Sequence, residues 1–288
     1  MATYILYNPK AGKGTITEDI KKIAALYEDT VECIDVTAIE DLSDFVLKKE
    51  ENERIVICGG DGTINKFVNI VDTDSIKCDI LYYPAGTGND FLSDLEKTAE
   101  ECPISIKEYF KGLPTAQIKG IDYKFINGIG FGVDGYCCEV GDSIKASSDK
   151  PVDYTAIAIK GLLFHYKPTG ATVTVDGKTY RYEKVWIAPT MKGRYYGGGI
   201  MPAPNQSRND PEGKLSVTIF HGTGKLRTLA IFPSLFKGTH VSHKKVIAIH
   251  SGHEITVKFD APRALQVDGE TILDVTEYTA TSKVVAKV

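Results

Sequence analysis

The chain has 288 residues, of which 42% are hydrophobic and 25% are charged. These proportions are typical of a globular protein and exclude a disordered or fibrous one. The length allows two lobes of ordinary size. The formal net charge of −4 argues against a nucleic-acid-binding protein, because neutralising phosphates requires a basic surface.

Cysteine usage and hydropathy indicate the compartment. The six cysteines show no CxxC spacing, so we expect reduced thiols and no metal site built on them. The first residues lack the basic region of a signal peptide, and no run approaches the roughly 18 apolar residues of a transmembrane helix. We therefore expect a cytoplasmic protein.

The first 120 residues alternate short apolar runs with segments of helical periodicity. The strand-like runs begin about 25 residues apart, which is typical of βαβ units and predicts a parallel sheet. The predicted strands are residues 4–7, 31–36, 55–58 and 80–83, and the predicted helices are 16–27, 42–46 and 63–71.

The pattern changes near residue 120, where strand-like runs begin to dominate. One helical stretch, residues 154–166, interrupts them. The sequence thus predicts an α/β N-terminal lobe with a parallel sheet, residues 1–121, and a β-rich second lobe, residues 122–275, built as a sandwich or distorted barrel. The predicted strands of the second lobe are residues 125–126, 171–175, 184–188, 215–220, 246–249, 255–259 and 263–267.

Three glycine-bearing loops follow three of the N-terminal strands. Their sequences are NPKAGKG at 8–14, CGGDGT at 58–63 and PAGTGND at 84–90. Ligands bind at the carboxyl edge of a parallel sheet, and glycines there let backbone N–H groups approach phosphate oxygens. Asp61 would supply the anionic oxygen that a phosphate-bridging Mg²⁺ requires. The loops therefore predict a nucleotide-binding protein.

These three motifs, in this order, resemble those of the diacylglycerol-kinase-type lipid kinase family, within the superfamily of NAD kinases and phosphofructokinases. GGDGT is shared across that superfamily, whereas GGDGT followed by PAGTGND is more specific to the lipid kinases. The resemblance covers nearly the whole chain. It implies ATP as co-substrate, Mg²⁺ as cofactor, a lipid alcohol such as diacylglycerol as acceptor, an active site in the cleft between the lobes, and a return of residues 276–288 to the first lobe.

The resemblance also implies which residues contact the nucleotide. Taken alone, Thr37 could equally be a helix N-cap, and Asp61 could cap a helix while still reaching a metal. The implied contacts come from the three loops, the end of the second strand and the helix after GGDGT: Asn8, Pro9, Lys10, Ala11, Gly12, Thr37, Gly59, Gly60, Asp61, Gly62, Thr63, Asn65, Gly86, Thr87 and Asn89.

Two metal sites follow from the same resemblance. Asp61, Asp90 and Asp122 would form a network around the catalytic Mg²⁺. A structural Mg²⁺ would bind the carboxylate of Glu212 and the backbone carbonyls of Asn209 and Lys214. The family commonly has Asp-Gly at this turn, and the longer glutamate strains strict octahedral geometry.

Asp268 and Glu270 belong to a late acidic motif, Val-Asp-Gly-Glu. By residue type, Asp-Gly is a strong signal for a hairpin turn. In the family this motif supplies the catalytic base that accepts the proton of the lipid hydroxyl. Asp268 is the first candidate, and Glu270 would share its face if the segment is extended.

Two other segments have plainer interpretations. Residues 130–135 match G-x-G-x-x-G, but they lack the βαβ context of a dinucleotide site, so we expect close backbone packing. Residues 237–253 carry lysines and histidines without an acid. A solvated sheet edge is expected there, with weak docking to anionic lipid as the alternative.

The sequence thus predicts an ATP-dependent lipid kinase that acts peripherally at the inner membrane face. Its partners would be ATP, a lipid alcohol and the membrane surface, with no nucleic acid, and a homodimer is left open. The alternatives are an NAD kinase and a catalytically silent nucleotide-binding sensor. The residues do not select among lipid alcohols.

Overall fold

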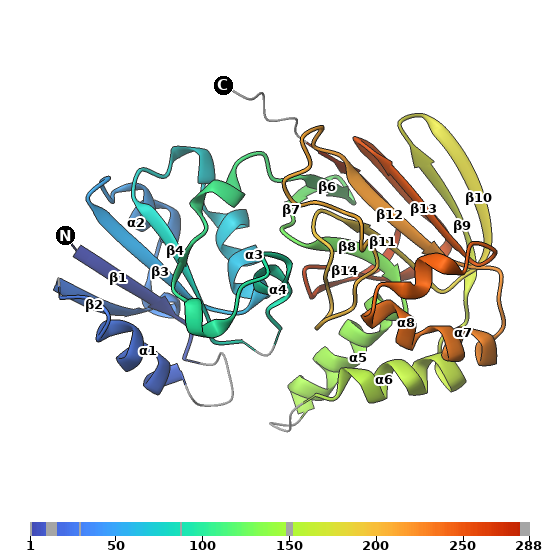
Figure 1. Cartoon of the computed structure of the whole chain (residues 1–288), viewed down its shortest axis with the longest axis horizontal. Coiled ribbons are helices and arrows are strands. Elements are labelled where there is room, and N and C mark those ends of the chain that lie inside the picture. The colour runs from blue at the N-terminus through green and yellow to red at the C-terminus, as the bar shows by residue number, and fades with distance from the viewer. Residues whose placement is uncertain (1, 10–15, 29, 87, 148–151, 283–288) are drawn as a thin grey trace. The chain divides into compact units, whose positions relative to one another are not determined.

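The computed structural model describes residues 2–9, 16–28, 30–86, 88–147 and 152–282. The chain divides into two compact units, Met1–Leu113 and Pro114–Val288, and each has its own sheet (Figure 1). This division falls earlier in the chain than the expected boundary at residue 121.

The sheet of the first unit has the strand order β2-β1-β3-β4-β5. The first four strands are parallel, which confirms the predicted α/β lobe. A short fifth strand, which sequence did not predict, is antiparallel to β4. The strands are β1 Ala2–Tyr7, β2 Thr30–Asp35, β3 Glu53–Gly59, β4 Asp79–Pro84 and β5 Ile104–Ser105.

Helices cover both faces of this sheet. Side chains alternate along a strand, so Ile5 and Val56 pack under α1, whereas Leu6 and Ile57 face the opposite side, near Phe67 of α3. The helices are α1 Ile16–Ala24, α2 Leu42–Leu47, α3 Asp61–Ile70 and α4 Asp90–Asp94, with 3₁₀ turns η1 Val36–Ala38, η2 Thr73–Ser75, η3 Ala99–Glu101 and η4 Lys107–Phe110.

The described residues of the second unit form an antiparallel, ten-stranded sheet. Its long strand β14 pairs with β15 and also with β9 and β8, so the sheet branches and encloses a large apolar core. This confirms the predicted β-rich, sandwich-like lobe. The strands are β6 Thr115–Ile118, β7 Ile121–Lys124, β8 Gly128–Gly132, β9 Thr169–Val175, β10 Lys178–Val185, β11 Ile187–Met191, β12 Leu215–Phe220, β13 Ile247–Gly252, β14 Glu254–Val267 and β15 Glu270–Thr281.

The C-terminal strand differs from expectation. Residues 276–281 were expected to return to the first lobe. They lie instead in β15, which pairs with β14 and with β6, where Thr281 is opposite Thr115. The described part of the expected return thus belongs to the second sheet, and residues 283–288 lie outside the described residues.

Helices of the second unit pack on a separate apolar cluster that includes Trp186, Ile187 and Phe220. The predicted helical stretch 154–166 is confirmed as α6 followed by a π-helical turn, η5. The glycine-rich start of α5 concealed that helix from sequence analysis. The elements are α5 Val133–Ser147, α6 Tyr154–Lys160, η5 Gly161–His165, α7 Lys225–Ile231, α8 Pro233–Phe236 and the 3₁₀ turn η6 Thr239–Ser242.

The glycines of the 130–135 segment serve close backbone packing, as predicted. A Cβ added at Gly132 would lie 2.3 Å from the carbonyl oxygen of Trp186. One added at Gly135 would lie 2.1 Å from the carbonyl oxygen of Ala264. No larger residue lets α5 approach β14 this closely.

We expect Gly135→Ala to destabilise the protein by about 1–3 kcal/mol, although alanine favours a helix, because α5 must move away from β14. The measurement is the thermal unfolding midpoint. Gly224→Ala is the control, since a methyl group there meets nothing within 4 Å. A Gly135→Ala variant as stable as the wild type would contradict this packing account.

Candidate functional site

A pocket of about 460 Å³ lies at the carboxyl edge of the first sheet. Asn8 after β1, Thr37 after β2 and Thr63 on α3 all line it. These residues come from three separate segments of the chain, and all were expected to contact a nucleotide. The strand order changes direction between β1 and β3, which is where ligands bind in open α/β sheets.

The remaining lining divides into an apolar part and a charged part. One cation, Lys66, was not anticipated from sequence. The helical spacing of Lys66 from Thr63 indicates that it faces the pocket, because Thr63, Lys66 and Ile70 occupy one face of α3. Asn65, which was expected to contact the nucleotide, does not line the pocket. It is buried, and its backbone carbonyl accepts a hydrogen bond from the Asn69 side-chain amide at 2.9 Å. The other lining residues are Leu6, Val36, Ile39, Glu40, Asp41, Leu42, Ile57 and Phe67.

Thr37 is held by the residue at the end of β2. Its backbone N–H and its hydroxyl both donate to Oδ1 of Asp35, at 2.8 and 2.7 Å. Asp35 is therefore the cap of η1, and the alternative that Thr37 is an N-cap is wrong. This arrangement fixes Thr37 in the wall of the pocket.

The second and third glycine loops pack directly on each other. A Cβ at Gly86 would lie 2.6 Å from the Cα of Gly60, so neither loop tolerates a side chain there. The N–H of Ala85 donates to the carbonyl of Gly59 at 2.9 Å, and the N–H of Asp61 donates to that of Gly88 at 3.3 Å. These glycines bring the two loops together, and their contact with phosphate remains a prediction.

The Asp61 carboxylate joins the same two loops. Its oxygens accept the N–H groups of Asp90 and Phe91 at 2.8 and 3.0 Å, and the residue is only 8% exposed. Asp61 thus binds the first turn of α4, while its own helix α3 has Gly60 as N-cap and therefore no side-chain cap. A carboxylate oxygen has two lone pairs, so Asp61 can still bind a cation.

The expected catalytic metal network is only partly assembled within one unit. Asp90 is buried at the start of α4, whereas Asp122 is exposed on β7 of the second unit. Among the described residues, no three His, Cys, Asp or Glu side chains are grouped to hold a metal. Asp61 has the donor chemistry that Mg²⁺ prefers.

Other expected contacts of the first unit have varied positions. Asn89 is fixed in its loop, because its Oδ1 accepts the Tyr82 hydroxyl at 3.0 Å. Pro9 is exposed after β1. Lys10, Ala11, Gly12 and Thr87 lie outside the described residues.

The late acidic motif is a two-residue hairpin turn between β14 and β15. Val267 pairs with Glu270, and both Asp268 and Gly269 have positive φ, 47° and 92°. The hairpin interpretation is confirmed, so the condition under which Asp268 and Glu270 would share a face, an extended segment, is not met. Asp268 is buried and Glu270 is exposed, so the two carboxylates do not share a strand face.

The Asp268 carboxylate accepts three backbone N–H groups. Those of Asn127 and Gly128 donate to Oδ1 at 2.9 Å each, and that of Ile126 donates to Oδ2 at 2.6 Å. The N–H of Asp268 donates in turn to the carbonyl of Gly128 at 3.0 Å. This side chain therefore ties the hairpin turn to the start of β8.

Asp134, which sequence analysis did not single out as a site residue, lies near this turn. Burial raises the pKa of Asp134 to about 6, while the Tyr196 and Gln266 side chains oppose that rise. Within the described residues, neither Asp134 oxygen forms a hydrogen bond of ordinary geometry, nor do the Tyr196 hydroxyl and the Gln266 amide nitrogen. The Oε1 of Gln266 accepts the N–H of Gly269 at 2.9 Å, so Gln266, which lies close enough to Asp134 to influence its pKa, also contacts the turn.

The expected structural Mg²⁺ turn is stabilised by its own side chains. The Glu212 carboxylate pairs with the Lys214 ammonium group. The Lys214 carbonyl accepts the Gln206 amide at 2.9 Å, and its N–H donates to Asp210 at 2.8 Å. These contacts engage two of the three expected ligands, so a metal bound by Asn209, Glu212 and Lys214 stays a prediction.

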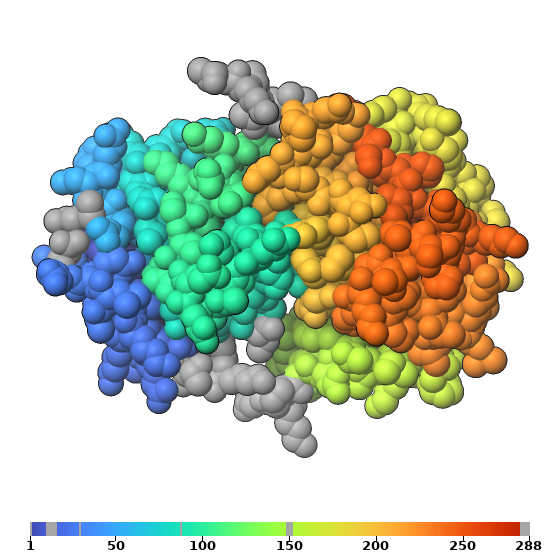
Figure 2. All heavy atoms as spheres, viewed as in Figure 1, coloured from blue at the N-terminus to red at the C-terminus, as the bar shows by residue number. Residues whose placement is uncertain are grey.

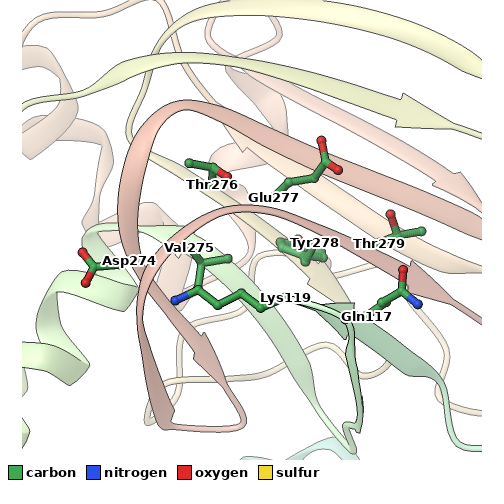
Figure 3. A pocket seen from close by; sticks show the side chains of 9 residues that line it. Gln117, Lys119, Asp274, Val275, Thr276, Glu277, Tyr278 and Thr279 are labelled. Atoms are coloured by element: carbon green, nitrogen blue, oxygen red, sulfur yellow. The ribbon is translucent and has the colours of Figure 1, made fainter.

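A smaller pocket of about 290 Å³ lies between β6 and β15 of the second unit (Figure 3). Gln117, Lys119 and Glu277 line it, and the Lys119 ammonium donates to the carbonyl of Leu273 at 2.8 Å. It contains none of the expected site residues.

Asp134 predicts a pH dependence of stability. Its pKa is higher in the folded state than its ordinary value of 3.8, so the folded state binds the proton more tightly. The contribution of Asp134 to the free energy of unfolding is fully present below about pH 4 and is lost as the pH rises through about 6. Asp134→Asn should therefore gain stability relative to the wild type between pH 4 and 7.5, on the order of 2 kcal/mol. The measurement is the unfolding midpoint of both proteins at several pH values in this range. If the difference between the two midpoints does not change with pH, the raised pKa of Asp134 is contradicted.

Two family models match the chain. The diacylglycerol kinase catalytic domain matches residues 2–123, and the YegS C-terminal NAD kinase beta sandwich-like domain matches residues 127–285. Among the described residues, no helix is both long enough and apolar enough to cross a membrane.

Individual relatives agree with these models. A diacylglycerol kinase of Mycobacterium tuberculosis strain H37Rv is 24% identical over 201 residues, 67% of this chain and 63% of that protein. The chain therefore spans less than two thirds of that relative. A Staphylococcus aureus strain Newman protein, provisionally named a lipid kinase, is 24% identical over 94% of this chain and 90% of its own length.

Solved structures share the fold. A diacylglycerol kinase from Bacillus anthracis strain Sterne aligns with a TM-score of 0.62 and 20% identity, covering 97% of this chain and 93% of its own. The chain thus belongs to the lipid kinase family that combines a diacylglycerol kinase catalytic domain with a YegS-type, NAD-kinase-like β-sandwich domain.

Proposed function

We propose that this protein transfers the γ-phosphoryl group of ATP to the hydroxyl of diacylglycerol or a related lipid alcohol. The observation that carries the proposal is the pocket at the carboxyl edge of the first sheet, where Asn8, Thr37 and Thr63 meet. The protein would work in the cytoplasm and meet its lipid at the inner membrane face. Its association into a homodimer is left to measurement.

The lining of this pocket suits a nucleotide. Apolar side chains such as Ile39 and Phe67 can cover a base, while Lys66 can neutralise a phosphate. The N-terminus of α3 begins within the GGDGT loop, and helix N-termini favour phosphate. We propose that the phosphates lie beside this loop.

Mg²⁺ would neutralise charge on the β- and γ-phosphates during transfer. Asp61 is the residue we assign to it, with Asp90 and Asp122 as outer contributors. Because Asp61 also holds the first turn of α4, it would fix the third loop relative to the cation. The same carboxylate would then orient both the cation and the third glycine loop.

The proton of the lipid hydroxyl needs an acceptor, and we assign this role to Glu270 before Asp268. The Asp268 carboxylate is buried and already accepts three N–H groups, whereas Glu270 is exposed at the end of the turn. Asp268 would then position the turn that carries Glu270. This reverses the order expected from sequence.

The direct test is transfer of labelled γ-phosphate from ATP to a panel of lipid alcohols in mixed micelles, with NAD as a parallel acceptor. We expect label in at least one lipid and none in NAD. Label in NAD alone would make the protein an NAD kinase. ATP binding without any transfer would favour the silent sensor.

Asp61→Asn should lower kcat at least about 100-fold at ordinary Mg²⁺, because it removes the charge that holds the cation. The substitution also weakens the hydrogen bonds that cap α4, so the control is a variant in which the cap of another helix is weakened in the same way. Asp153→Asn serves, since Asp153 caps α6 through the N–H of Ala156 at 2.9 Å. Near-normal turnover in Asp61→Asn would contradict the metal assignment.

Glu270→Gln should lower kcat by about 10²–10⁴-fold while the unfolding midpoint stays unchanged, as expected for a general base. Asp268→Asn should lower both kcat and the unfolding midpoint, because its amide group opposes one or more of the three N–H donors. Measuring kcat, the ATP dissociation constant and the midpoint separates the roles. If Glu270→Gln loses less than tenfold in kcat, the base lies elsewhere.

A further inference from the structure

Helices of the second unit expose large apolar side chains to solvent. Leu226 on α7 is 79% exposed and Phe164 on η5 is 70% exposed. Ile159 on α6 and Phe236 on α8 are 40% and 39% exposed. Such side chains usually occur singly on a protein surface, so a group of four on adjoining helices requires an explanation.

The helices that carry them are neighbours. The ammonium group of Lys225, at the start of α7, donates to the carbonyl of Leu163 in η5 at 2.8 Å. Leu226 follows Lys225 in the chain and Phe164 follows Leu163, so this contact joins the two segments that carry these apolar side chains. Helices α6, α7 and α8 bury apolar residues in one shared cluster; α6 and α7 lie at the lower edge of this unit in Figure 1, with α8 above them, and these segments form adjoining surface in Figure 2.

The two segments of chain that carry these side chains contain cations and no acidic residue. No Asp or Glu occurs from Tyr154 to Val175 or from Gly213 to His253. Asp153, which caps α6, immediately precedes the first of these segments, and Glu254 immediately follows the second. This is unusual in a chain with a net charge of −4. The exposed cations beside the apolar side chains are Lys160, Lys167, Lys225, Arg227 and Lys237.

We propose that this helical face, formed by Ile159, Lys160, Phe164, Leu226, Arg227 and Phe236, docks on the surface of an anionic lipid bilayer. The inference rests on the proposed function, which requires a lipid acceptor, and it names the surface that meets the membrane. Apolar and aromatic side chains enter the interface while cations contact anionic headgroups. A face with both features and no acid is complementary to such a bilayer.

The face differs from the lysine- and histidine-rich stretch 237–253. The last part of that stretch, Ile247–Gly252, is β13, an edge strand of the sheet, so the interpretation as a sheet edge holds for this part, whereas Lys237, Lys244 and Lys245 precede the strand. His240 is buried, and burial lowers its pKa, so it contributes no charge to docking. Lys244 and Lys245 are exposed there and provide a matched control.

The test is co-sedimentation of the full chain with vesicles of phosphatidylcholine, with and without about one third phosphatidylglycerol. Two double variants alter the face: Phe164→Ser with Leu226→Ser, and Lys160→Gln with Arg227→Gln. The controls are Leu273→Ser, at an apolar side chain 51% exposed on β15, and Lys244→Gln with Lys245→Gln.

We expect each face variant to bind anionic vesicles at least about tenfold more weakly, and both controls to bind within about twofold of the wild type. Lipid phosphorylation in detergent micelles should be unchanged in all of them. The inference would be overturned if the wild-type protein does not bind anionic vesicles, or if the face variants bind them as tightly as the controls do. Vesicle binding is measured without ATP, so a failed kinase assay leaves this result interpretable.

Discussion

Hydrogen bonds from backbone N–H groups to buried aspartate carboxylates hold both candidate motifs together. Asp61 accepts two such bonds from the first turn of α4, and Asp268 accepts three from the segment that begins β8. Bonds of this type to an ionised acceptor contribute about 1.5–3 kcal/mol each. The contact between the second and third glycine loops and the hairpin turn keep their shape because these carboxylates are in place.

This constraint gives each motif aspartate a structural role beside any chemical one. Asp61 connects the second and third glycine loops, so a cation bound there would be fixed relative to both. Asp268 fixes the turn that exposes Glu270, which leaves the exposed carboxylate as the better proton acceptor. Loss of activity on substitution of either aspartate therefore needs a stability measurement beside it.

The parallel sheet, its helices and the hairpin character of Asp-Gly could be predicted from sequence, because each depends on local periodicity or on a two-residue turn. Helix α5 was missed because its glycines, which signal loops, are required by close contacts, Gly135 with β14 and Gly141 with Tyr154 of α6. Asp134 was missed because its environment depends on neighbours distant in sequence, whereas Lys66 has a local signal, since it shares one face of α3 with Thr63. The C-terminal strand was misplaced, since pairing between β15 and β6 leaves no local pattern.

The central claim is that these carboxylates hold the loops through the backbone amides, and amide hydrogen exchange measures it directly. In Asp268→Asn, protection from exchange should fall at least about tenfold at the backbone amides of Ile126, Asn127 and Gly128 and stay unchanged in the first unit. The reason is that the asparagine side chain has one acceptor oxygen where the aspartate carboxylate has two. Asp61→Asn should do the same at Asp90 and Phe91. Unchanged protection at these amides in both variants would contradict the account.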